Sequence, residues 1–357
     1  MPILKVAVLY GGKSTEHEVS VHSAQTVCRV LSEKKDKYEV YPIFISKQGR
    51  WFLQKACGPQ HPTDKPITPV LKDEANLVAL DGSFSIKADV VFPVLHGTNC
   101  EDGTMQGFLE TLDVPYVGCG VLASAMGMDK EISKLIAREA GVPILPWKIV
   151  SKDAGYDLSA LQAWAEEQGL PVFVKPVRLG SSVGVRKVKT VGELQSALDF
   201  ALQFDTDVLV EKGVDHAREI FCAIYGEGAH IKSSACGELS TVAGEFFDYN
   251  AKYIVAGGCK TKVPADIPAD LAQKMRQDSE AVFRALRGSG LARVDFLMDK
   301  NGAYYFSEIN TMPGMSETSL FPQLFSACGE DYGQILDGLI ALALRVHARK
   351  AALSLNR

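Results

Sequence analysis

The sequence of 357 residues has no long hydrophobic run, no low-complexity segment and no large excess of charge of one sign. Its longest uninterrupted apolar stretches, such as Leu339–Leu344, fall far short of the ~18 residues that span a bilayer. The N-terminal residues lack the layout of a signal peptide, so we expect a cytoplasmic protein. Lys plus Arg total 38 against 43 for Asp plus Glu, and this balance argues against a surface built for nucleic acid or anionic membranes.

Cysteine pairs at a metal-binding or redox spacing are also missing. The eight cysteines include no C-x-x-C pair, which fits reduced thiols better than disulfides or structural zinc. They are Cys28, Cys57, Cys100, Cys119, Cys222, Cys236, Cys259 and Cys328. We expect them to act as small apolar residues.

What is present is the composition of a multidomain globular protein. Apolar residues make up 46% and charged residues 23% of the chain, which excludes disordered, collagen-like and coiled-coil classes. At ~150 residues per domain, the length predicts two or three domains. Alternation of β-like and helix-like segments predicts an α/β (α+β) fold. The predicted domains are 1–125, 126–213 and 214–357.

The first predicted domain contains an open parallel sheet. Apolar runs typical of buried strands occur at 4–9, 38–45 and 90–95. Residues 55–75, rich in Pro, Gly and Lys, predict a surface excursion. Further along the chain, helices are expected at 129–140, 191–203, 268–285 and 332–350.

The clearest chemical signal is a pair of β segments, RVDFLMD and AYYFSEIN, joined through Asn301-Gly302, the favoured dipeptide of a two-residue hairpin turn. That register places Asp295 opposite Glu308 and Arg293 opposite Asn310, all on one face. Facing carboxylates repel, and a hard cation such as Mg²⁺ would remove that cost. The alternative is a solvated hairpin whose acids splay apart. The adjacent Arg293 favours a binding site, because an arginine at this position indicates that a further anion binds beside the two acids.

A loop rich in Gly and Ser, residues 178–184, lies between two β-like segments and follows Lys175. Small residues allow backbone N–H groups to approach phosphate oxygens, and a lysine adds a point charge. Taken alone, a loop of this composition between strands is more often a simple turn.

The glycines at Gly11-Gly12 are followed by Lys13-Ser14 and imitate a P-loop, but Ala7 stands where that motif needs its first glycine. Thr15 and Glu18 fit a capping box at the start of a helix, so Glu18 has both a structural and a ligand-binding interpretation.

Three weaker signals remain. His96 ends an apolar strand, where ligands of open parallel sheets bind, although a hydrogen-bonded turn residue is the plainer interpretation. Residues 248–258 join aromatic residues to glycines and could form a mobile lid or an ordinary loop. Gly118-x-Gly120 is a loose dinucleotide fingerprint that a tight turn explains better.

Taken together, the segments resemble the D-alanine:D-alanine ligase family within the ATP-grasp superfamily. The matching segments cover nearly the whole chain in the family's order: GGKSTEHEVS, VLHGTNCEDGTMQG, MDK, FVKPVRLGSSVGV, VEK, REI, FFDYNAKY, RVDF and EINTMPGMSETSLFP. Several spaced motifs in one order are far more specific than any one of them alone. The resemblance implies three α/β domains, with ATP held between the central and C-terminal domains.

The resemblance also implies roles for individual residues. ATP-binding roles fall on Lys130, Lys175, Ser182, Glu211, Lys212, Glu219, Phe246 and Lys252. The implied ligands of two Mg²⁺ ions, with Mn²⁺ as an alternative, are Asp295, Glu308 and Asn310. Catalytic roles fall on Glu18, Ser181, Tyr253, Arg293 and Gly314, and substrate contacts on His96, Ser319 and Leu320.

The implied reaction joins two D-alanines at the expense of ATP. The first carboxylate attacks the γ-phosphate and becomes an acyl phosphate, which the second amine attacks. Arg293 and the Gly314 N–H would stabilise the oxyanion. Glu18 would bind the first ammonium, and Ser181 and Tyr253 would hydrogen-bond to Glu18 and close the lid. The implied partners are D-alanine, ATP and a second copy of the chain, with no nucleic acid and no membrane.

Alternative functions differ in what they require. Relatives on the same scaffold join D-alanine to D-serine or D-lactate; Lys252-Tyr253 resembles the dipeptide-forming lid, which disfavours D-lactate, whereas an apolar pocket rejects an added hydroxyl only weakly. A non-catalytic ATP-binding module would predict loss of the metal ligands or Arg293. A dinucleotide-dependent oxidoreductase rests only on the Gly118 motif.

Overall fold

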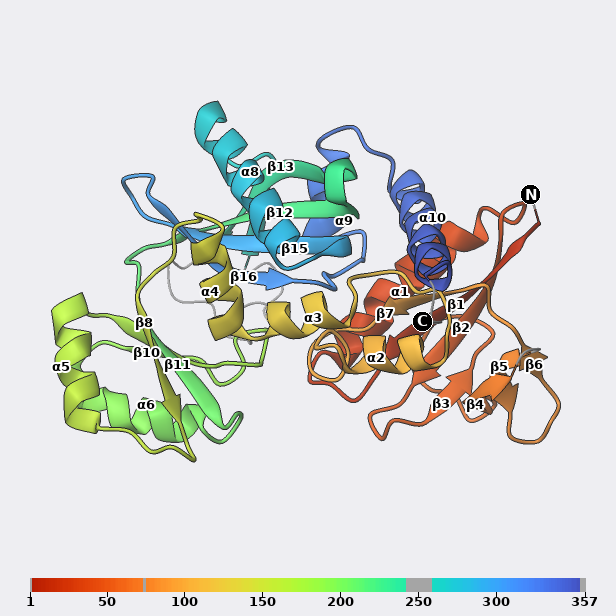
Figure 1. Cartoon of the computed structure of the whole chain (residues 1–357), viewed down its shortest axis with the longest axis horizontal. Coiled ribbons are helices and arrows are strands. Elements are labelled where there is room, and N and C mark those ends of the chain that lie inside the picture. Colours follow the sequence, from red (N-terminus) through yellow and green to blue (C-terminus); the bar gives the residue numbers. More distant parts are fainter. Residues whose placement is uncertain (1, 73–74, 242–258, 354–357) are drawn as a thin grey trace.

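The computed structural model describes residues 2–72, 75–241 and 259–353. Within these residues the strands form three sheets, and helices pack against each of them (Figure 1). The predicted α/β class is confirmed. None of the described helices is long and apolar enough to cross a membrane.

The first sheet has the strand order β6-β5-β4-β3-β2-β1-β7. Its strands are β1 (Leu4–Gly11), β2 (Tyr38–Ile45), β3 (Trp51–Leu53), β4 (Lys65–Lys72), β5 (Ala75–Ala79), β6 (Ser85–Ile86) and β7 (Val90–Val94). As predicted, β1 pairs in parallel with β2 and β7. Val8 and Tyr10 face a core shared with helix α1 (His17–Ser32), whereas Ala7 and Leu9 face a core that includes Leu109 of α2 (Thr104–Thr111). This continuous apolar run is what a strand buried on both faces requires.

The predicted surface excursion at 55–75 is wrong for its second half. Residues 65–72 form β4, which pairs antiparallel with β3 and β5. Two prolines, Pro66 and Pro69, lie in this strand. Proline cannot donate to a strand ladder and usually indicates loop, which is why the local sequence did not reveal the strand.

The expectation that all cysteines are reduced thiols is also wrong for one pair. Cys28 on α1 and Cys57 after β3 form a disulfide, with Cα atoms 6.7 Å apart. They are separated by 29 residues, so no local spacing motif announces them; the packing of α1 beside the sheet brings them together. Within the described residues, Cys100, Cys119, Cys222 and Cys236 are buried free thiols, as predicted for apolar fillers.

The second sheet is antiparallel, in the order β10-β9-β11-β8. Its strands are β8 (Trp147–Ser151), β9 (Val172–Pro176), β10 (Arg186–Val188) and β11 (Asp207–Lys212). Helices α5 (Leu158–Gln168) and α6 (Leu194–Ala201) contribute to the core on one face, and the 3-10 turn η1 (Val191–Glu193) contacts both helices. Because strand side chains alternate, Val172 and Val174 enter that core while Phe173 and Lys175 face the opposite side.

The third sheet is antiparallel, in the order β14-β13-β12-β15-β16. Its strands are β12 (Arg218–Glu227), β13 (Lys232–Thr241), β14 (Cys259–Lys262), β15 (Ser289–Met298) and β16 (Tyr304–Asn310), with the 3-10 turn η2 (Gly228–His230) between β12 and β13. Helices α8 (Ala269–Ala285) and α9 (Leu320–Ser326) both pack against β12 and β13.

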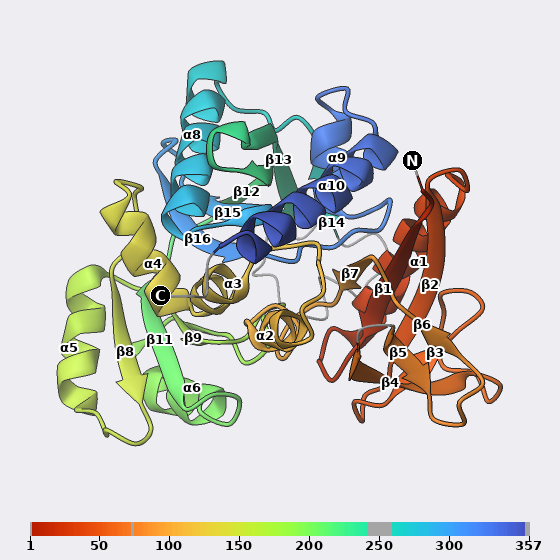
Figure 2. The same ribbon diagram turned by 45° about the vertical axis from the view of Figure 1, so that its right-hand side comes forward.

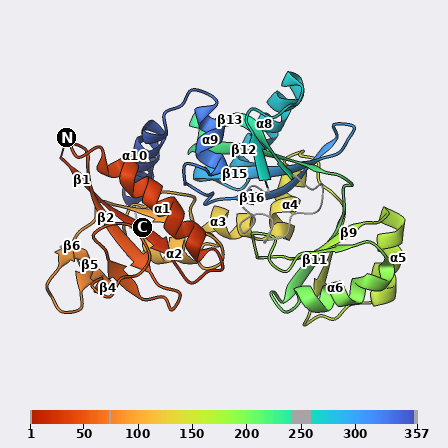
Figure 3. The same ribbon diagram turned by 180° about the vertical axis from the view of Figure 1, so that it is seen from behind.

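Two connections join the sheets. Helix α10 (Tyr332–Ala351) packs against β12 and β15 of the third sheet and also against α1 and β7 of the first (Figure 2). Helices α3 (Val121–Met128) and α4 (Lys130–Glu139) lie between the first and second sheets, and both contact β16 (Figure 3). The three sheets fall within the three predicted domain ranges, whereas α4, assigned to the central range, packs on the third sheet. The boundaries themselves stay a prediction.

Candidate active site

A cavity of about 720 Å³ lies between the second and third sheets. Its walls come from β9, β10 and the loop between them on one side, and from β12, β15 and β16 on the other. Predicted site residues that line it are Lys130, Lys175, Ser181, Ser182, Glu219, Asp295 and Glu308. Residues from four separate parts of the chain, namely α4, the β9–β10 segment, β12 and the β15–β16 hairpin, therefore meet at one cavity.

The β15–β16 hairpin brings the predicted acids together. Asp295 pairs with Glu308, and Arg293 pairs with Asn310, as predicted. The predicted two-residue turn is wrong, because the Asp299 N–H donates to the Ala303 carbonyl at 2.8 Å and closes a three-residue loop. The register is shifted by one residue near this turn.

A β-bulge between the turn and the site residues restores the predicted pairing of β15 with β16. Phe296 pairs with Phe306, whereas the preceding Asp295 pairs with Glu308, so Ser307 is the extra residue. Gly302, at φ +86°, supplies the left-handed residue that three-residue hairpin loops favour. The turn and the bulge offset each other, and the four site residues end in the positions that the sequence predicted.

Each of the opposed carboxylates has its own cation. Arg293 donates two hydrogen bonds of 2.7 Å to Asp295, and the Asn310 amide donates a third at 3.1 Å. Glu308 lies 3.3 Å from the Lys130 Nζ. The local charges are thereby balanced, which explains how two acids can face each other across the hairpin.

The oxygens of this group suit a divalent cation. Two carboxylates and one amide oxygen are hard ligands, and Mg²⁺ usually keeps further oxygens from water or phosphate. Among the described residues, no cluster of three or more His, Cys, Asp or Glu side chains could enclose a metal by itself. Asp295, Glu308 and Asn310 therefore fit a metal that shares its coordination with a bound phosphate.

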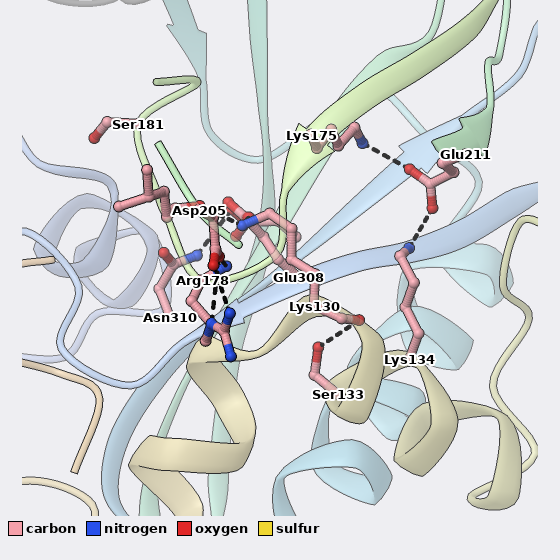
Figure 4. Close-up of polar contacts among 12 residues, drawn as sticks. Lys130, Ser133, Lys134, Lys175, Arg178, Ser181, Asp205, Glu211, Glu308 and Asn310 are labelled. Carbon is pink, nitrogen blue, oxygen red and sulfur yellow. Dashed lines mark hydrogen bonds and ion pairs between the residues drawn. The ribbon is translucent and has the colours of Figure 1, made fainter. Parts of the chain in front are cut away.

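Behind the cavity, Lys175, Glu211 and Lys134 form a chain of charges (Figure 4). The Lys175 Nζ donates to the Glu211 Oε2 at 2.6 Å, and the Glu211 Oε1 forms an ion pair with Lys134. Burial raises the pKa of Glu211, but the charges of Lys134 and Lys175 outweigh it and the net pKa is lowered. The carboxylate of Glu211, which was predicted to contact adenine, therefore lies between Lys134 and Lys175. The neighbouring Lys212 is the last residue of β11.

The loop between β9 and β10 has a specific backbone shape. Ser181 and Ser182 have positive φ angles of +54° and +57°, and the Val183 N–H donates to the Gly180 carbonyl at 3.1 Å. Non-glycine residues in this region cost of order 1–3 kcal/mol each and concentrate at functional sites. The Lys130 Nζ donates to the Leu179 carbonyl at 2.5 Å and anchors the loop to α4.

The acid that faces this loop is Glu16, so the prediction that Ser181 hydrogen-bonds to Glu18 is wrong. The Ser181 hydroxyl donates to the Glu16 carboxylate. Gly97 lies against the same carboxylate, since a Cβ there would come within 2.6 Å of the Glu16 Oε2. Glu18 is 75% exposed and pairs with Lys47 at 3.0 Å.

The helix start explains the error. Helix α1 begins at His17 with Glu16 at its N-cap, and its cap has no side-chain hydrogen bond, so the predicted Thr15–Glu18 capping box is absent. Successive helical residues point about 100° apart. Glu18 therefore leaves the site while Glu16, before the first turn, enters it.

His96 is buried rather than open to the cavity. Its Nδ1 lies 2.8 Å from the Met312 carbonyl and its Nε2 lies 3.2 Å from the Ser23 hydroxyl. These partners assign the neutral Nδ1–H tautomer, and burial lowers the pKa of His96. Ser23 also accepts from the Met315 N–H at 3.2 Å.

Glu101 adds a second bridge between the same segments, and the sequence did not single it out as a site residue. Its Oε1 accepts from the Gly97 N–H at 3.1 Å and its Oε2 from the Met312 N–H at 3.2 Å. The loop between Asn310 and Gly314 is thus held by buried groups of the first sheet.

The remaining predicted residues lie at the end of that loop, at the start of α9, or outside the described residues. Gly314 lies against Ser319, because a Cβ there would come within 2.8 Å of the Ser319 hydroxyl. Ser319 is the N-cap of α9 and Leu320 its first residue. Phe246, Lys252 and Tyr253 lie outside the described residues.

Comparisons with known proteins agree with this arrangement. Residues 5–119 match the family model "D-ala D-ala ligase N-terminus" and residues 136–341 match "D-ala D-ala ligase C-terminus". A D-alanine–D-alanine ligase of Thermoanaerobacter sp. (strain X514) is 43% identical over 97% of this chain and 98% of that protein. A D-alanine–D-alanine ligase A of Bradyrhizobium diazoefficiens is 42% identical over 98% of this chain and 97% of that protein.

Solved structures give the same result. The D-alanine–D-alanine ligase of Coxiella burnetii aligns with a TM-score of 0.86 at 33% identity, covering 98% of this chain and 97% of that one. A D-Ala:D-Ser ligase of Enterococcus faecalis aligns with a TM-score of 0.83 at 32% identity, covering 96% and 100%. Both family models and near full-length relatives at over 40% identity lead to one conclusion: the chain belongs to the D-alanine–D-alanine ligase family.

Proposed function

We propose that this protein joins two D-alanines to D-alanyl-D-alanine with consumption of ATP, as a step in peptidoglycan precursor synthesis. Family membership over nearly the whole chain supports the reaction. The observation that carries it is the hairpin pairing of Asp295 with Glu308 and of Arg293 with Asn310 at the wall of a large cavity. A module that only bound nucleotide would need none of these four residues.

The cavity would hold the adenosine of ATP in one part and its phosphates in another. Lys130 and Lys175 would hold phosphate oxygens, and the Ser181-Ser182 turn would direct backbone N–H groups toward them. Glu219 on β12 would contact the ribose. Glu211 and Lys212, at the end of β11, would contact the adenine, and Phe246 would stack on it. Lys252 would also bind ATP.

Asp295, Glu308 and Asn310 would hold Mg²⁺, as two ions, with Mn²⁺ as an alternative. When bound, the metal would neutralise charge on the transferring phosphoryl group. The two carboxylates are already on one face of the hairpin, so the chain itself provides the orientation. Arg293, which donates two hydrogen bonds to Asp295, would direct its guanidinium to a reacting oxygen.

The substrates would occupy the end of the cavity nearest the first sheet. Glu16, beside Ser181 and Gly97, would bind the ammonium of the first D-alanine. The carboxylate of that residue would attack the γ-phosphate to give an acyl phosphate, and the amine of the second D-alanine would then displace phosphate. Arg293 and the Gly314 N–H would stabilise the oxyanion, and Ser319 with Leu320 would hold the second carboxylate.

Tyr253 would complete the lid beside Ser181, and His96 would stand behind the first substrate. Closure of this part of the cavity would keep water from the acyl phosphate. We further propose a homodimer in the cytoplasm, which the family relationship favours.

A D-alanyl-D-serine product is the second candidate, because a D-Ala:D-Ser ligase is among the solved structures that align over the full chain. The two substrates differ by one hydroxyl, which a pocket discriminates weakly. The test is phosphate release from ATP and Mg²⁺ with D-alanine alone and with D-serine or D-lactate added, with products identified by mass. D-Alanyl-D-alanine as the main product would support the first candidate; a mixed product would favour the second; no release stimulated by amino acid would refute both.

A further inference from the structure

Lys134 is a fully buried lysine to which the proposed reaction gives no role; burial lowers the pKa of Lys134, and the negative charge of Glu211 opposes that shift. It lies on α4, four residues after Lys130, and its side chain is 1% exposed. Its Nζ donates to the Phe306 carbonyl of β16 at 3.2 Å and forms an ion pair with Glu211 of β11. A charge so far from water is costly unless the structure compensates it.

Glu211 is equally buried and serves two lysines. Its side chain is 1% exposed, and its second oxygen binds the Nζ of Lys175, which is 13% exposed and lines the cavity. The three residues form a line of ion pairs that runs from Lys134 through Glu211 to Lys175 (Figure 4). Only Lys175 reaches the position where a phosphate would bind.

The charges along this line add to those of other cations that line the cavity, among them Lys187 and Lys189. Lys130 contacts Glu308, Arg293 contacts Asp295 and Lys175 contacts Glu211, so each of these three cations lies beside one acid. A lysine and a carboxylate 2.6 Å apart act on a third group mainly as a dipole, whose field falls faster with distance than that of a charge. Lys134 is a second cation on Glu211, and it gives the line of three a net charge of plus one.

We propose that Lys134 is a positioning residue for nucleotide binding: it compensates the carboxylate that holds Lys175 in place, so that Lys175 keeps its full positive charge for the phosphates. This inference rests on the proposed ATP-dependent function and adds a residue to it. Glu211 holds the Lys175 ammonium in one place, and Lys134 prevents that carboxylate from neutralising it.

Helix α4 makes this possible through its periodicity. Residues four apart lie on one face of a helix, so Lys130 and Lys134 both project toward the space between the second and third sheets. Lys130 contacts Glu308 and the Leu179 carbonyl at the front of the cavity, and Lys134 reaches Glu211 behind it. One helix face therefore supplies both cations.

The test compares ligands that differ only in phosphate. Binding of ADP and of adenosine is measured by competition against a fluorescent ATP analogue, for the whole protein and for Lys134→Met, which keeps a long apolar side chain. We expect ADP to bind roughly tenfold more weakly, the effect of one unit charge about 10 Å away at an effective dielectric constant of ~20, and adenosine to change less than twofold. Lys5→Met, at an exposed position on β1 of the first sheet, removes the same net charge from a sheet that does not contain Glu211, and it should leave both affinities unchanged.

A double variant separates charge from packing. Lys134→Met with Glu211→Gln again leaves one net positive charge, carried by Lys175, and no uncompensated buried acid. We expect it to recover the wild-type ratio of ADP to adenosine affinity, even if the new amide changes both affinities together. Lys134→Arg should retain most of the ratio, because it keeps the charge.

Several results would overturn the inference. They are an unchanged ADP affinity in folded Lys134→Met, an equal loss of ADP and adenosine binding, or a ratio that stays low in the double variant. If Lys134→Met does not fold, the double variant alone decides between the outcomes. Failure of the wild-type protein to bind any adenine nucleotide would instead refute the proposed function.

Discussion

The Ser181 hydroxyl donates a hydrogen bond to the Glu16 carboxylate and joins the loop after β9 to the N-terminal end of α1. These residues are 165 positions apart and belong to different sheets of the molecule. Ser181 lines the cavity, so the contact identifies which acid of the segment STEHEVS faces the site.

The two acids of that segment form a matched pair for mutagenesis. Glu16→Gln removes the charge beside Ser181 and Gly97, and we expect turnover with D-alanine to fall by about 10² or more, the usual size of a lost charged contact to the reacting centre. Glu18→Gln, at an exposed position that forms an ion pair with Lys47, should change turnover less than threefold. Steady-state phosphate release measures both, and the opposite order would refute the assignment of Glu16.

Arg293 is expected to act on the reacting oxygen rather than on ATP binding. Arg293→Ala should lower turnover by about 10² or more, while a fluorescent ATP analogue still binds. Its two hydrogen bonds to Asp295 would also be lost, so Arg293→Lys serves as the control that keeps a charge. Near-normal turnover of the alanine variant would contradict the oxyanion role.

Asp295 is expected to control the use of metal. Asp295→Asn keeps the shape of the side chain but removes half of the carboxylate pair that the β15–β16 hairpin brings together. The Mg²⁺ concentration for half-maximal activity should rise about tenfold, because hard cations prefer charged oxygens. Activity titrated with Mg²⁺ and Mn²⁺ gives the measurement, and an unchanged metal requirement would refute the hairpin site.

Glu101 should make stability depend on pH. Burial, together with the charge of Glu16, raises the pKa of Glu101 from 4.5 to about 8. Between these values the folded protein holds a proton that the unfolded chain has released, so this group favours folding most at low pH and its contribution is lost as the pH rises toward 8. The slope can reach about 1.4 kcal/mol per pH unit.

The variant Glu101→Gln cannot titrate and should show a flatter dependence. Urea unfolding at several pH values across this window compares its stability with that of the wild-type protein. Equal slopes in the two proteins would show that Glu101 does not hold the proton.

Much of the fold was readable from local sequence because it depends on local regularities. The apolar runs predicted the parallel pairing of β1 with β2 and β7, and Gly141 marked the end of α4. Strand β4 was hidden by its prolines, since composition reports the usual behaviour of a residue and not its place beside an irregularity in the strand pairing, such as the one after Pro69.

The hairpin shows how a correct result can rest on an incorrect step. The sequence predicted a two-residue turn, and the protein has a three-residue turn with a bulge at Ser307. Because side chains alternate between the two faces of a sheet, a one-residue shift of the strand pairing moves every side chain of the shifted strand to the opposite face. Two shifts of opposite sense left Asp295 and Glu308 facing each other.

The sequence by itself determined the family, the order of the elements and the residue types at the site, because these follow from spacing along one chain. Tertiary structure alone decided that Glu16 and not Glu18 meets Ser181, that Cys28 meets Cys57, and that Lys134 reaches Glu211. Each of these contacts joins elements distant in sequence, and their geometry depends on how helices and sheets pack. No local spacing contains that information, because burial and side-chain direction are set only when the three sheets come together.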